Sequence, residues 1–150
     1  MTQADARPAA PDVPAVTRLK LTGFRNYARL DLELDARPVA LFGPNGAGKT
    51  NLVEAVSFLG PGRGVRAAGS DAVRMKTADG PAPIWAVYAE AMTRAGAVSL
   101  ATGSDPAEPA RRKTRLDGVA ATQSELAWLF LMVWLTPCED RLWAGPRADR

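Results

Sequence analysis

The sequence predicts an α/β fold, and three observations lead to this prediction. Apolar and polar residues alternate in residues 17–22 and again in 29–34, which is the period of a half-buried β-strand. A continuous apolar run at 39–42, typical of a strand buried on both faces, leads directly into a glycine-rich stretch. From Lys49 onward the apolar residues recur at helical spacing instead. The glycines are therefore expected to lie between a strand and a helix.

The first two strands are expected to form a hairpin. Their link is the short turn-like sequence Phe24-Arg25-Asn26-Tyr27, and we favour core packing for its two aromatic side chains. Residues 1–15, which precede the hairpin, are rich in alanine and proline and lack an apolar core stretch. This composition predicts a flexible tail and not a signal peptide.

The helix after the glycines is expected to end at Gly60 and Pro61, because these residues stop helices. Its apolar face consists of Leu52, Val53, Val56 and Leu59. Residues 62–83 contain several glycines and prolines and are predicted mainly as loop, with a short ordered piece around Val73.

The rest of the chain is predicted to be mainly antiparallel strands. Strands at 84–92 and 97–101 flank a turn at 94–96, and an exposed loop follows at 103–110. Asp117-Gly118 is a strong hairpin signal between strands at 112–116 and 119–121. Thr122 and Glu125 form a predicted capping box that opens a short helix. The apolar run 126–135 is expected to finish as a strand before Pro137.

Composition excludes several classes of site. The 150 residues fit one globular domain, and the net charge of +3 is only a mild basic bias. With no histidine and one cysteine, Cys138, the chain cannot build a zinc site, an internal disulfide framework or a His-dependent catalytic triad. We interpret Cys138 as a small apolar residue near a strand end. The longest apolar run has ten residues, too few to span a bilayer. We therefore expect a soluble, cytoplasmic protein without a membrane partner.

Residues 43–50 carry the chemistry, because they satisfy the pattern Gly-x-x-x-x-Gly-Lys-Ser/Thr in full. Glycines allow successive backbone N–H groups to turn inward and form a nest for phosphate oxygens, and the following helix adds its positive N-terminal end. The lysine would reach the β and γ phosphates, and the threonine hydroxyl would bind Mg²⁺. The motif thus predicts ATP and Mg²⁺ as cofactors, bound by Gly43, Pro44, Asn45, Gly46, Ala47, Gly48, Lys49 and Thr50.

The position of this loop after a hairpin is similar to that in ABC-type ATPase heads. Residues 21–27, Leu-Thr-Gly-Phe-Arg-Asn-Tyr, together with the P-loop and the Asn-Leu-Val-Glu-Ala-Val that follows it, resemble the RecF family of bacterial DNA replication and repair proteins, relatives of the SMC and Rad50 heads. The resemblance continues more loosely through residues 62–66, 115–118 and 135–140, and covers nearly everything from residue 16 onward. It implies a P-loop NTPase fold in which residues 16–150 form the first lobe of the head, without the C-terminal lobe.

The resemblance also implies a function. Such a protein would be an ATP-dependent DNA-binding protein of replication and recombinational repair, would dimerise around two nucleotides, and would help mediator proteins to load recombinase at single-strand gaps in the SOS response. By the family pattern, Arg25, Asn26 and Asn51 would also lie beside the nucleotide. An ordinary charged turn between two strands is the alternative for Arg25 and Asn26.

Two groups of basic residues are candidates for contact with DNA phosphates. The first group, near the P-loop helix, consists of Arg63, Arg66, Arg74 and Lys76. The second consists of Arg111, Arg112, Lys113 and Arg115. No aromatic residue interleaves with either group, which argues against base stacking. The simpler interpretation, which we favour for each group, is a solvated charged face.

Hydrolysis in this class needs an acidic pair that ends a buried strand, and a signature loop from a partner subunit; neither is recognisable. The nearest candidate is 131–135, but Glu139 and Asp140 follow only after a turn-like Thr-Pro-Cys, and Glu54 is expected to face solvent or a neighbouring strand. We therefore expect nucleotide binding without turnover, and exposed sheet edges. Two alternatives remain at this stage, the nucleotide-binding subunit of an ABC transporter and a non-catalytic nucleotide-binding fragment.

Overall fold

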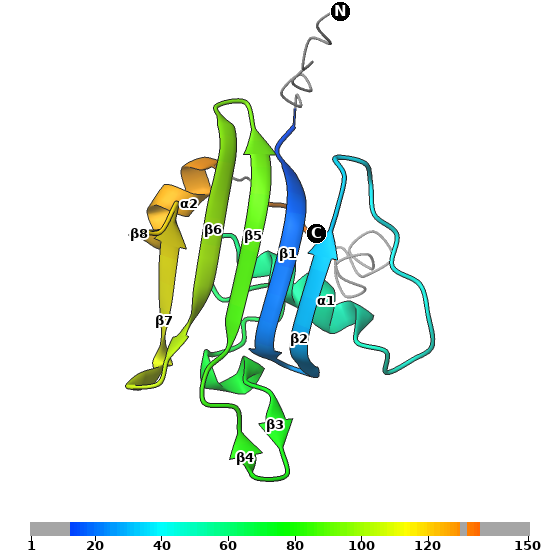
Figure 1. The fold of residues 1–150 in the computed structure, drawn as a ribbon, viewed down its shortest axis with the longest axis vertical. Helices are drawn as coiled ribbons and strands as arrows, with labels where there is room; N and C mark the ends of the chain where they lie inside the picture. The colour runs from blue at the N-terminus through cyan, green and yellow to red at the C-terminus, as the bar shows by residue number, and fades with distance from the viewer. Residues whose placement is uncertain (1–12, 130–131, 136–150) are drawn as a thin grey trace, which may run out of the picture.

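The α/β class is confirmed by the structure, a computed structural model that describes residues 13–129 and 132–135. An antiparallel sheet of six strands in the order β2-β1-β5-β6-β7-β8 forms the main body of this part of the chain, and both helices lie on one side of it (Figure 1). The strands of the sheet are β1 (Ala15–Phe24), β2 (Tyr27–Glu33), β5 (Ala86–Thr93), β6 (Gly96–Asp105), β7 (Glu108–Leu116) and β8 (Val119–Ala120). The helices are α1 (Lys49–Ser57) and α2 (Gln123–Leu129).

The predicted hairpin exists and forms one edge of the sheet. Leu21 of β1 lies opposite Leu30 of β2 on one side and Val87 of β5 on the other. The alternation of apolar side chains therefore places one face of β1 in the core, as its period of two requires. β1 begins at Ala15, so the last residue of the predicted tail is part of the sheet, whereas residues 1–12 lie outside the described residues.

Three aromatic rings hold α1 against the sheet. Phe24, Phe58 and Trp85 pack edge to face, with centroids 5.3 to 5.8 Å apart, and none is more than 1% exposed. These rings come from the end of β1, the end of α1 and the residue before β5, so they join all three elements at one point. Core packing of Phe24 is confirmed. Tyr27 is half-buried against the same core.

The strand expected at 39–42 does not form. These residues have no strand structure, and Val39 and Phe42 are 58% and 93% exposed. A strand needs a hydrogen-bonding neighbour, and no strand within residues 13–129 and 132–135 pairs with this segment. The strand expected before Pro137 is likewise absent from residues 132–135, while Cys138, Glu139 and Asp140 lie outside the described residues.

The loop expected at 103–110 is also wrong, because most of it is strand. β6 and β7 continue pairing through Gly103 opposite Lys113, and residue 105 pairs with residue 108, so only 106 and 107 turn. An ion pair of 2.7 Å between Lys113 and Asp105 supports this longer hairpin. Cross-strand pairing here outweighs the weak strand propensity of aspartate and proline.

The remaining connections follow the sequence closely. Asp117 and Gly118 both have positive φ, at 48° and 79°, as a two-residue hairpin turn requires. Between α1 and β5 the chain is mainly loop, with a one-turn helix, η1 (Asp71–Val73), and a small hairpin of β3 (Lys76–Thr77) and β4 (Gly80–Pro81). No helix in the described part of the chain has the length and hydropathy needed to cross a membrane.

Candidate nucleotide-binding site

The predicted P-loop leads directly into the N-terminal end of α1. Gly46 and Gly48 have φ values of 82° and 97°, which curl the loop, and the Ala47 N–H closes a turn by donating to the Pro44 carbonyl at 3.3 Å. The helix begins at Lys49, so the N–H groups of its first turn have no intrahelical acceptor. A cavity of about 290 Å³ lies at this point, lined by Asn45, Gly46, Gly48, Lys49, Thr50, Asn51 and Arg66.

The side chains of this cavity fit a nucleotide phosphate. The Lys49 ammonium donates to the carbonyls of Gly43 and Pro44 at 2.7 and 2.8 Å, which holds the positive charge beside the loop. Thr50 is exposed and lines the same cavity, so its hydroxyl could provide one oxygen ligand to Mg²⁺, a cation that usually takes its other ligands from phosphates, carboxylates and water. Backbone donors, a lysine and a hydroxyl are the donor set that a Mg²⁺-triphosphate requires.

The β1–β2 turn packs directly against the P-loop. The Asn51 side-chain amide donates to the Asn26 side-chain carbonyl at 2.9 Å. A Cβ atom placed on Gly48 would lie 2.6 Å from the Asn26 side-chain nitrogen and 2.8 Å from the Tyr27 hydroxyl. Only glycine leaves room for this contact, and only glycine adopts its positive φ without strain. The structure thus brings Asn26 and Asn51 together at the edge of the candidate site.

Glu54 connects the same turn to the middle of α1, and the expectation that it faces solvent or a neighbouring strand is wrong. Its side chain is fully buried and accepts two hydrogen bonds from Arg25, at 2.6 and 2.9 Å. Arg66 is a second partner of the carboxylate, at 3.1 Å. A buried carboxylate needs such partners. The helical period places Glu54 on the side of α1 opposite the predicted apolar face, so the sequence pattern shows neither its burial nor which arginines would reach it.

Only part of the first basic group lies near the P-loop cavity, and its members differ in their exposure and partners. A second cavity, of about 510 Å³, is lined by Arg25, Asn26, Asn51, Arg66, Ala72, Arg74, Met75 and Lys76. It shares Asn51 and Arg66 with the P-loop cavity. Arg74 pairs with Asp71 at 3.2 Å and donates to the Ala82 carbonyl, whereas Arg63 and Lys76 are exposed. Arg63 lines neither of these two cavities.

The second basic group divides between the two faces of the sheet. Arg111 and Lys113 are exposed and pair with acidic residues of the β6–β7 hairpin, and Arg115 is exposed as well. Arg112 points to the opposite side and contacts the end of α1. Its assignment as a solvated or DNA-contacting residue is therefore wrong, because its donors are directed at protein carbonyls.

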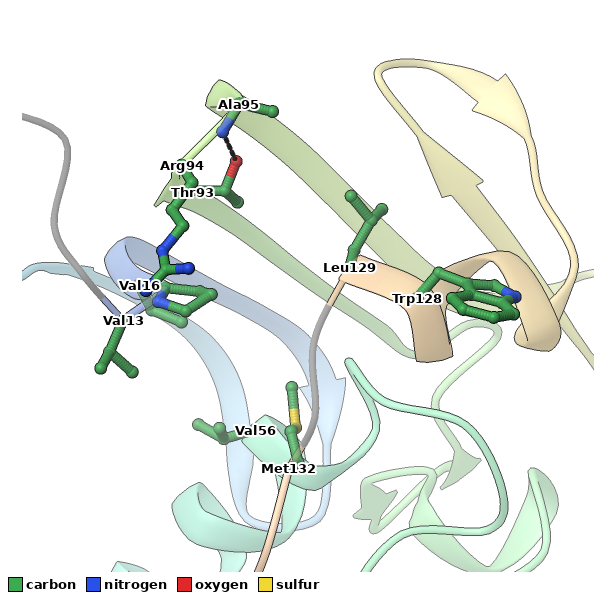
Figure 2. A pocket seen from close by; sticks show the side chains of 10 residues that line it. Val13, Val16, Val56, Thr93, Arg94, Ala95, Trp128, Leu129 and Met132 are labelled. Carbon is green, nitrogen blue, oxygen red and sulfur yellow. Dashed lines mark hydrogen bonds between the residues drawn. The ribbon is translucent and has the colours of Figure 1, made fainter.

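A further cavity, of about 740 Å³, lies between the start of β1, the β5–β6 turn, the end of α2 and Val56 of α1 (Figure 2). It differs chemically from the P-loop cavity. Val56, Leu129 and Met132 contribute to its mainly apolar wall, and Arg94 is the one charged residue in the lining. It offers no glycine loop or helix N-terminus for a phosphate. The P-loop cavity is therefore the better candidate for a nucleotide site.

Comparison with known proteins agrees with this geometry. Residues 18–70, which contain the hairpin, the P-loop and α1, match the family described as the AAA domain. A protein of Rhizobium meliloti named DNA replication and repair protein RecF is 49% identical over 138 residues, and one of Brucella suis with the same name is 42% identical over 140 residues. Over most of its length the chain is similar to part of RecF. The matches cover 90% and 93% of the chain but only 36% of each relative, so the chain spans about a third of the length of the curated RecF proteins it matches.

Solved structures give the same fold. A structure described as the recombination mediator protein RecF with ATP superimposes with a TM-score of 0.75 and 19% identity, over 87% of this chain and 35% of that one. A structure from a study of ATP-driven dimerization of SMC ATPases gives a TM-score of 0.64 and 23% identity, over 85% of this chain and 96% of that one. The fold is therefore that of the N-terminal lobe of RecF and SMC ATPase heads.

Proposed function

We propose that this chain is the nucleotide-binding first lobe of a RecF-like ATPase that acts on DNA in replication and recombinational repair. The observation that carries the proposal is the P-loop cavity itself, with curled glycines, an open helix N-terminus and Lys49 at one point. The names of the relatives support the DNA-repair context. Both relatives are named as DNA replication and repair proteins, which weighs against the ABC transporter alternative.

In this proposal ATP binds with its phosphates in the loop and with Mg²⁺ on the Thr50 hydroxyl. The N–H groups of the loop and first helical turn would bind the phosphate oxygens, and Lys49 would exchange its two carbonyl partners for the β and γ phosphates. Asn26 and Asn51 would border the nucleotide, and Arg25 would act through Glu54 by holding the turn in place.

Lys49→Ala tests the proposal. A charge-assisted contact to phosphate contributes about 1.5 to 3 kcal/mol, so we expect the affinity for Mg²⁺-ATP to fall by roughly tenfold to hundredfold. Displacement of a fluorescent ATP analogue measures this affinity. Lys20→Ala is a matched control, because Lys20 lies on the sheet and contacts Asp31 and Tyr88 instead. Equal affinity in the Lys49→Ala and unaltered proteins would show that the loop is not the site.

The proposal includes no turnover by this chain alone, because the sequence offers no recognisable acidic pair at the end of a buried strand. We expect binding of ATP or ADP without steady phosphate release. Steady, Mg²⁺-dependent phosphate release from pure protein would contradict this part of the proposal while supporting nucleotide binding. In the proposed whole protein, residues 39–42 and 132–135 would pair with strands of a second lobe.

DNA is the proposed partner, as single-stranded or gapped duplex, with Arg63, Arg66, Arg74 and Lys76 as the candidate contacts. Arg63 and Lys76 support this best because both are exposed, and Lys76 also lines the cavity that shares Asn51 and Arg66 with the P-loop cavity. If each neutralises a phosphate, Lys76→Ala should reduce the slope of log affinity against log salt concentration by about 1. It should also weaken binding to all DNA sequences by a similar factor. Mediator proteins, recombinase loading, a role in the SOS response, a homodimer and a cytoplasmic location belong to the same proposal.

A further inference from the structure

Arg112 of β7 is a half-buried arginine with an unusual environment. No carboxylate in the described part of the chain forms an ion pair with it. Burial lowers the pKa of its guanidinium to about 10, which still leaves the group charged at neutral pH. A buried cation without a carboxylate must find its stabilisation elsewhere.

That stabilisation comes from carbonyls at the C-cap of α1 and in the loop that follows it. Arg112 Nη2 donates to the Phe58 carbonyl and, at 3.0 Å, to the Gly60 carbonyl, while Nη1 donates to the Gly62 carbonyl at 2.5 Å. The guanidinium also lies 5.2 Å from the centroid of the Phe58 ring. The last carbonyls of a helix lack intrahelical partners and carry its partial negative charge. Of the three acceptors only Phe58 is the C-cap of α1, and Gly60 and Gly62 lie in the loop beyond it. Arg112 therefore places its charge at the C-terminal end of the helix whose other end is the P-loop, and also ties the following loop to β7.

The same contacts fix the segment that returns from the helix toward the P-loop. Nε of Arg112 donates to the Thr102 hydroxyl at 2.7 Å, which anchors the guanidinium to the sheet. Gly64 has a φ of 72°, and a Cβ atom on it would lie 2.7 Å from the Phe58 ring. The Val65 N–H then donates to the Ser57 hydroxyl at 2.8 Å. This tight return places the next residue, Arg66, at Glu54 and in the lining of the P-loop cavity.

We infer that Arg112 is a positioning residue for nucleotide binding, which acts by fixing α1 and the returning segment 58–66 against the sheet. The inference rests on the proposed nucleotide site. It predicts that the loss of Arg112 weakens nucleotide binding although the residue lies at the opposite end of α1 from the phosphates. Its planar fork matters as much as its charge, because three carbonyls and one hydroxyl lie around it.

The test compares Arg112→Ala with Arg111→Ala in the full 150-residue chain. Arg111 is the next residue on the same strand, but it is exposed and pairs only loosely, at 3.6 Å, with Glu108. We expect Arg112→Ala to weaken Mg²⁺-ATP binding by about tenfold, because it acts on the site only through the segment that it holds, and Arg111→Ala to leave it unchanged. Binding is measured well below the unfolding temperature of each variant.

Guanidinium ion at low, non-denaturing concentration gives a readout that general loss of stability would not produce. The ion should occupy the space left in Arg112→Ala and restore part of the lost affinity, while it should not strengthen binding by the unaltered protein or by Arg111→Ala. If Arg112→Ala does not fold, Arg112→Lys replaces it, since lysine keeps the charge and stem but cannot reach all the acceptors. The lysine variant is expected to show a similar loss of affinity.

The outcomes separate the two proposals. If the unaltered chain does not bind Mg²⁺-ATP, the proposed function fails, and the inference fails with it. If the unaltered chain binds but the folded Arg112→Ala or Arg112→Lys variant binds equally well, only the positioning role is overturned. A loss of affinity that guanidinium does not restore in Arg112→Ala, with normal affinity in Arg112→Lys, would also overturn it, because charge at that place would then be sufficient.

Discussion

The N-terminal ends of α1 and α2 differ in whether side chains cap them. At α2 the Glu125 carboxylate accepts from the Thr122 N–H at 2.6 Å, and the Thr122 hydroxyl accepts from the Glu125 N–H at 3.3 Å. At α1 the residue before the helix is Gly48, with no side-chain cap and no acidic residue in the first turn. The first N–H groups of α1 thus have no side-chain cap, whereas the N-terminal end of α2 is capped by Thr122 and Glu125.

This difference shows how a helix end can be kept available for a ligand. An acid or a capping hydroxyl at α1 would satisfy the N–H groups and cancel the positive end that a phosphate needs. The stabilising contacts of α1 lie further along instead. They are Asn51 against the hairpin turn, Glu54 between two arginines, and Phe58 and Arg112 at the C-terminal end.

Glu54→Gln should produce the largest effect on stability of the changes that follow from this comparison. The carboxylate is fully buried, and its replacement would leave Arg25 and Arg66 without their shared counter-charge. Removing one partner of a buried ion pair costs about 3 kcal/mol or more, and we expect a loss near that size in the free energy of unfolding measured with urea.

Asp31→Asn is the control for this change. Asp31 also contacts two cations, Arg18 and Lys20, but on the exposed face of the sheet, where solvent screens the interaction. Its replacement should leave stability nearly unchanged. A loss as large as that of Glu54→Gln would mean that burial is not what makes the Glu54 cluster important.

Gly48→Ala should have an intermediate effect on the free energy of unfolding. Comparison with Gly46→Ala separates the cost of backbone strain from that of steric contact. Gly46 and Gly48 both have positive φ in the same loop, but only at Gly48 would a new Cβ atom meet other atoms, those of Asn26 and Tyr27. A positive φ costs a residue with a Cβ about 1 to 2 kcal/mol. We expect Gly46→Ala to lose about 1 kcal/mol by this strain alone, and Gly48→Ala about 2 kcal/mol or more because contact adds to it.

The measurement is again the free energy of unfolding, together with the affinity for Mg²⁺-ATP. Gly48→Ala should bind the nucleotide more weakly than Gly46→Ala if the packing of the hairpin turn shapes the loop. Equal stability of the two variants would argue that the Asn26 side chain simply moves aside, and that the turn does not support the P-loop.

Much of this site could be predicted from the sequence because its signals are local. The glycine positions, Lys49 and Thr50 form a contiguous motif, and the period of Leu52, Val53 and Val56 predicts the helix that follows. The capping box of α2 and the turn at Asp117 and Gly118 are equally local, and the structure confirms both.

The errors arise where the outcome depends on partners distant in sequence. Val39 and Phe42 have strand propensity, but a strand also needs a neighbour, and the described residues supply none. Arg112 and Arg115 both lie in the predicted strand at 112–116, and alternation places them on opposite faces, but which face is covered depends on α1, which is distant in sequence. No local pattern shows that Arg25 and Arg66 meet at Glu54, since these residues are 29 and 12 positions away from it.

The smallest expected effect is a pH dependence of the free energy of unfolding, which the capped N-terminal end of α2 should contribute and the uncapped end of α1 should not. Hydrogen bonds from the Thr122 backbone and side chain hold the pKa of Glu125 below its usual value. Because the pKa is lower in the folded state, this cap stabilises the protein fully above the unfolded pKa, and the stabilisation is lost as the pH falls through the folded pKa.

Glu125→Gln should therefore be less stable than the unaltered protein at neutral pH, with a gap that narrows in acid. Asp31, Asp35 and Asp105 also have lowered pKa values, but their contributions are the same in both proteins and cancel in the difference. A gap that stays constant from neutral to acidic pH would show that the ionised carboxylate does not close α2, and the contrast with the open end of α1 would then lose its electrostatic basis.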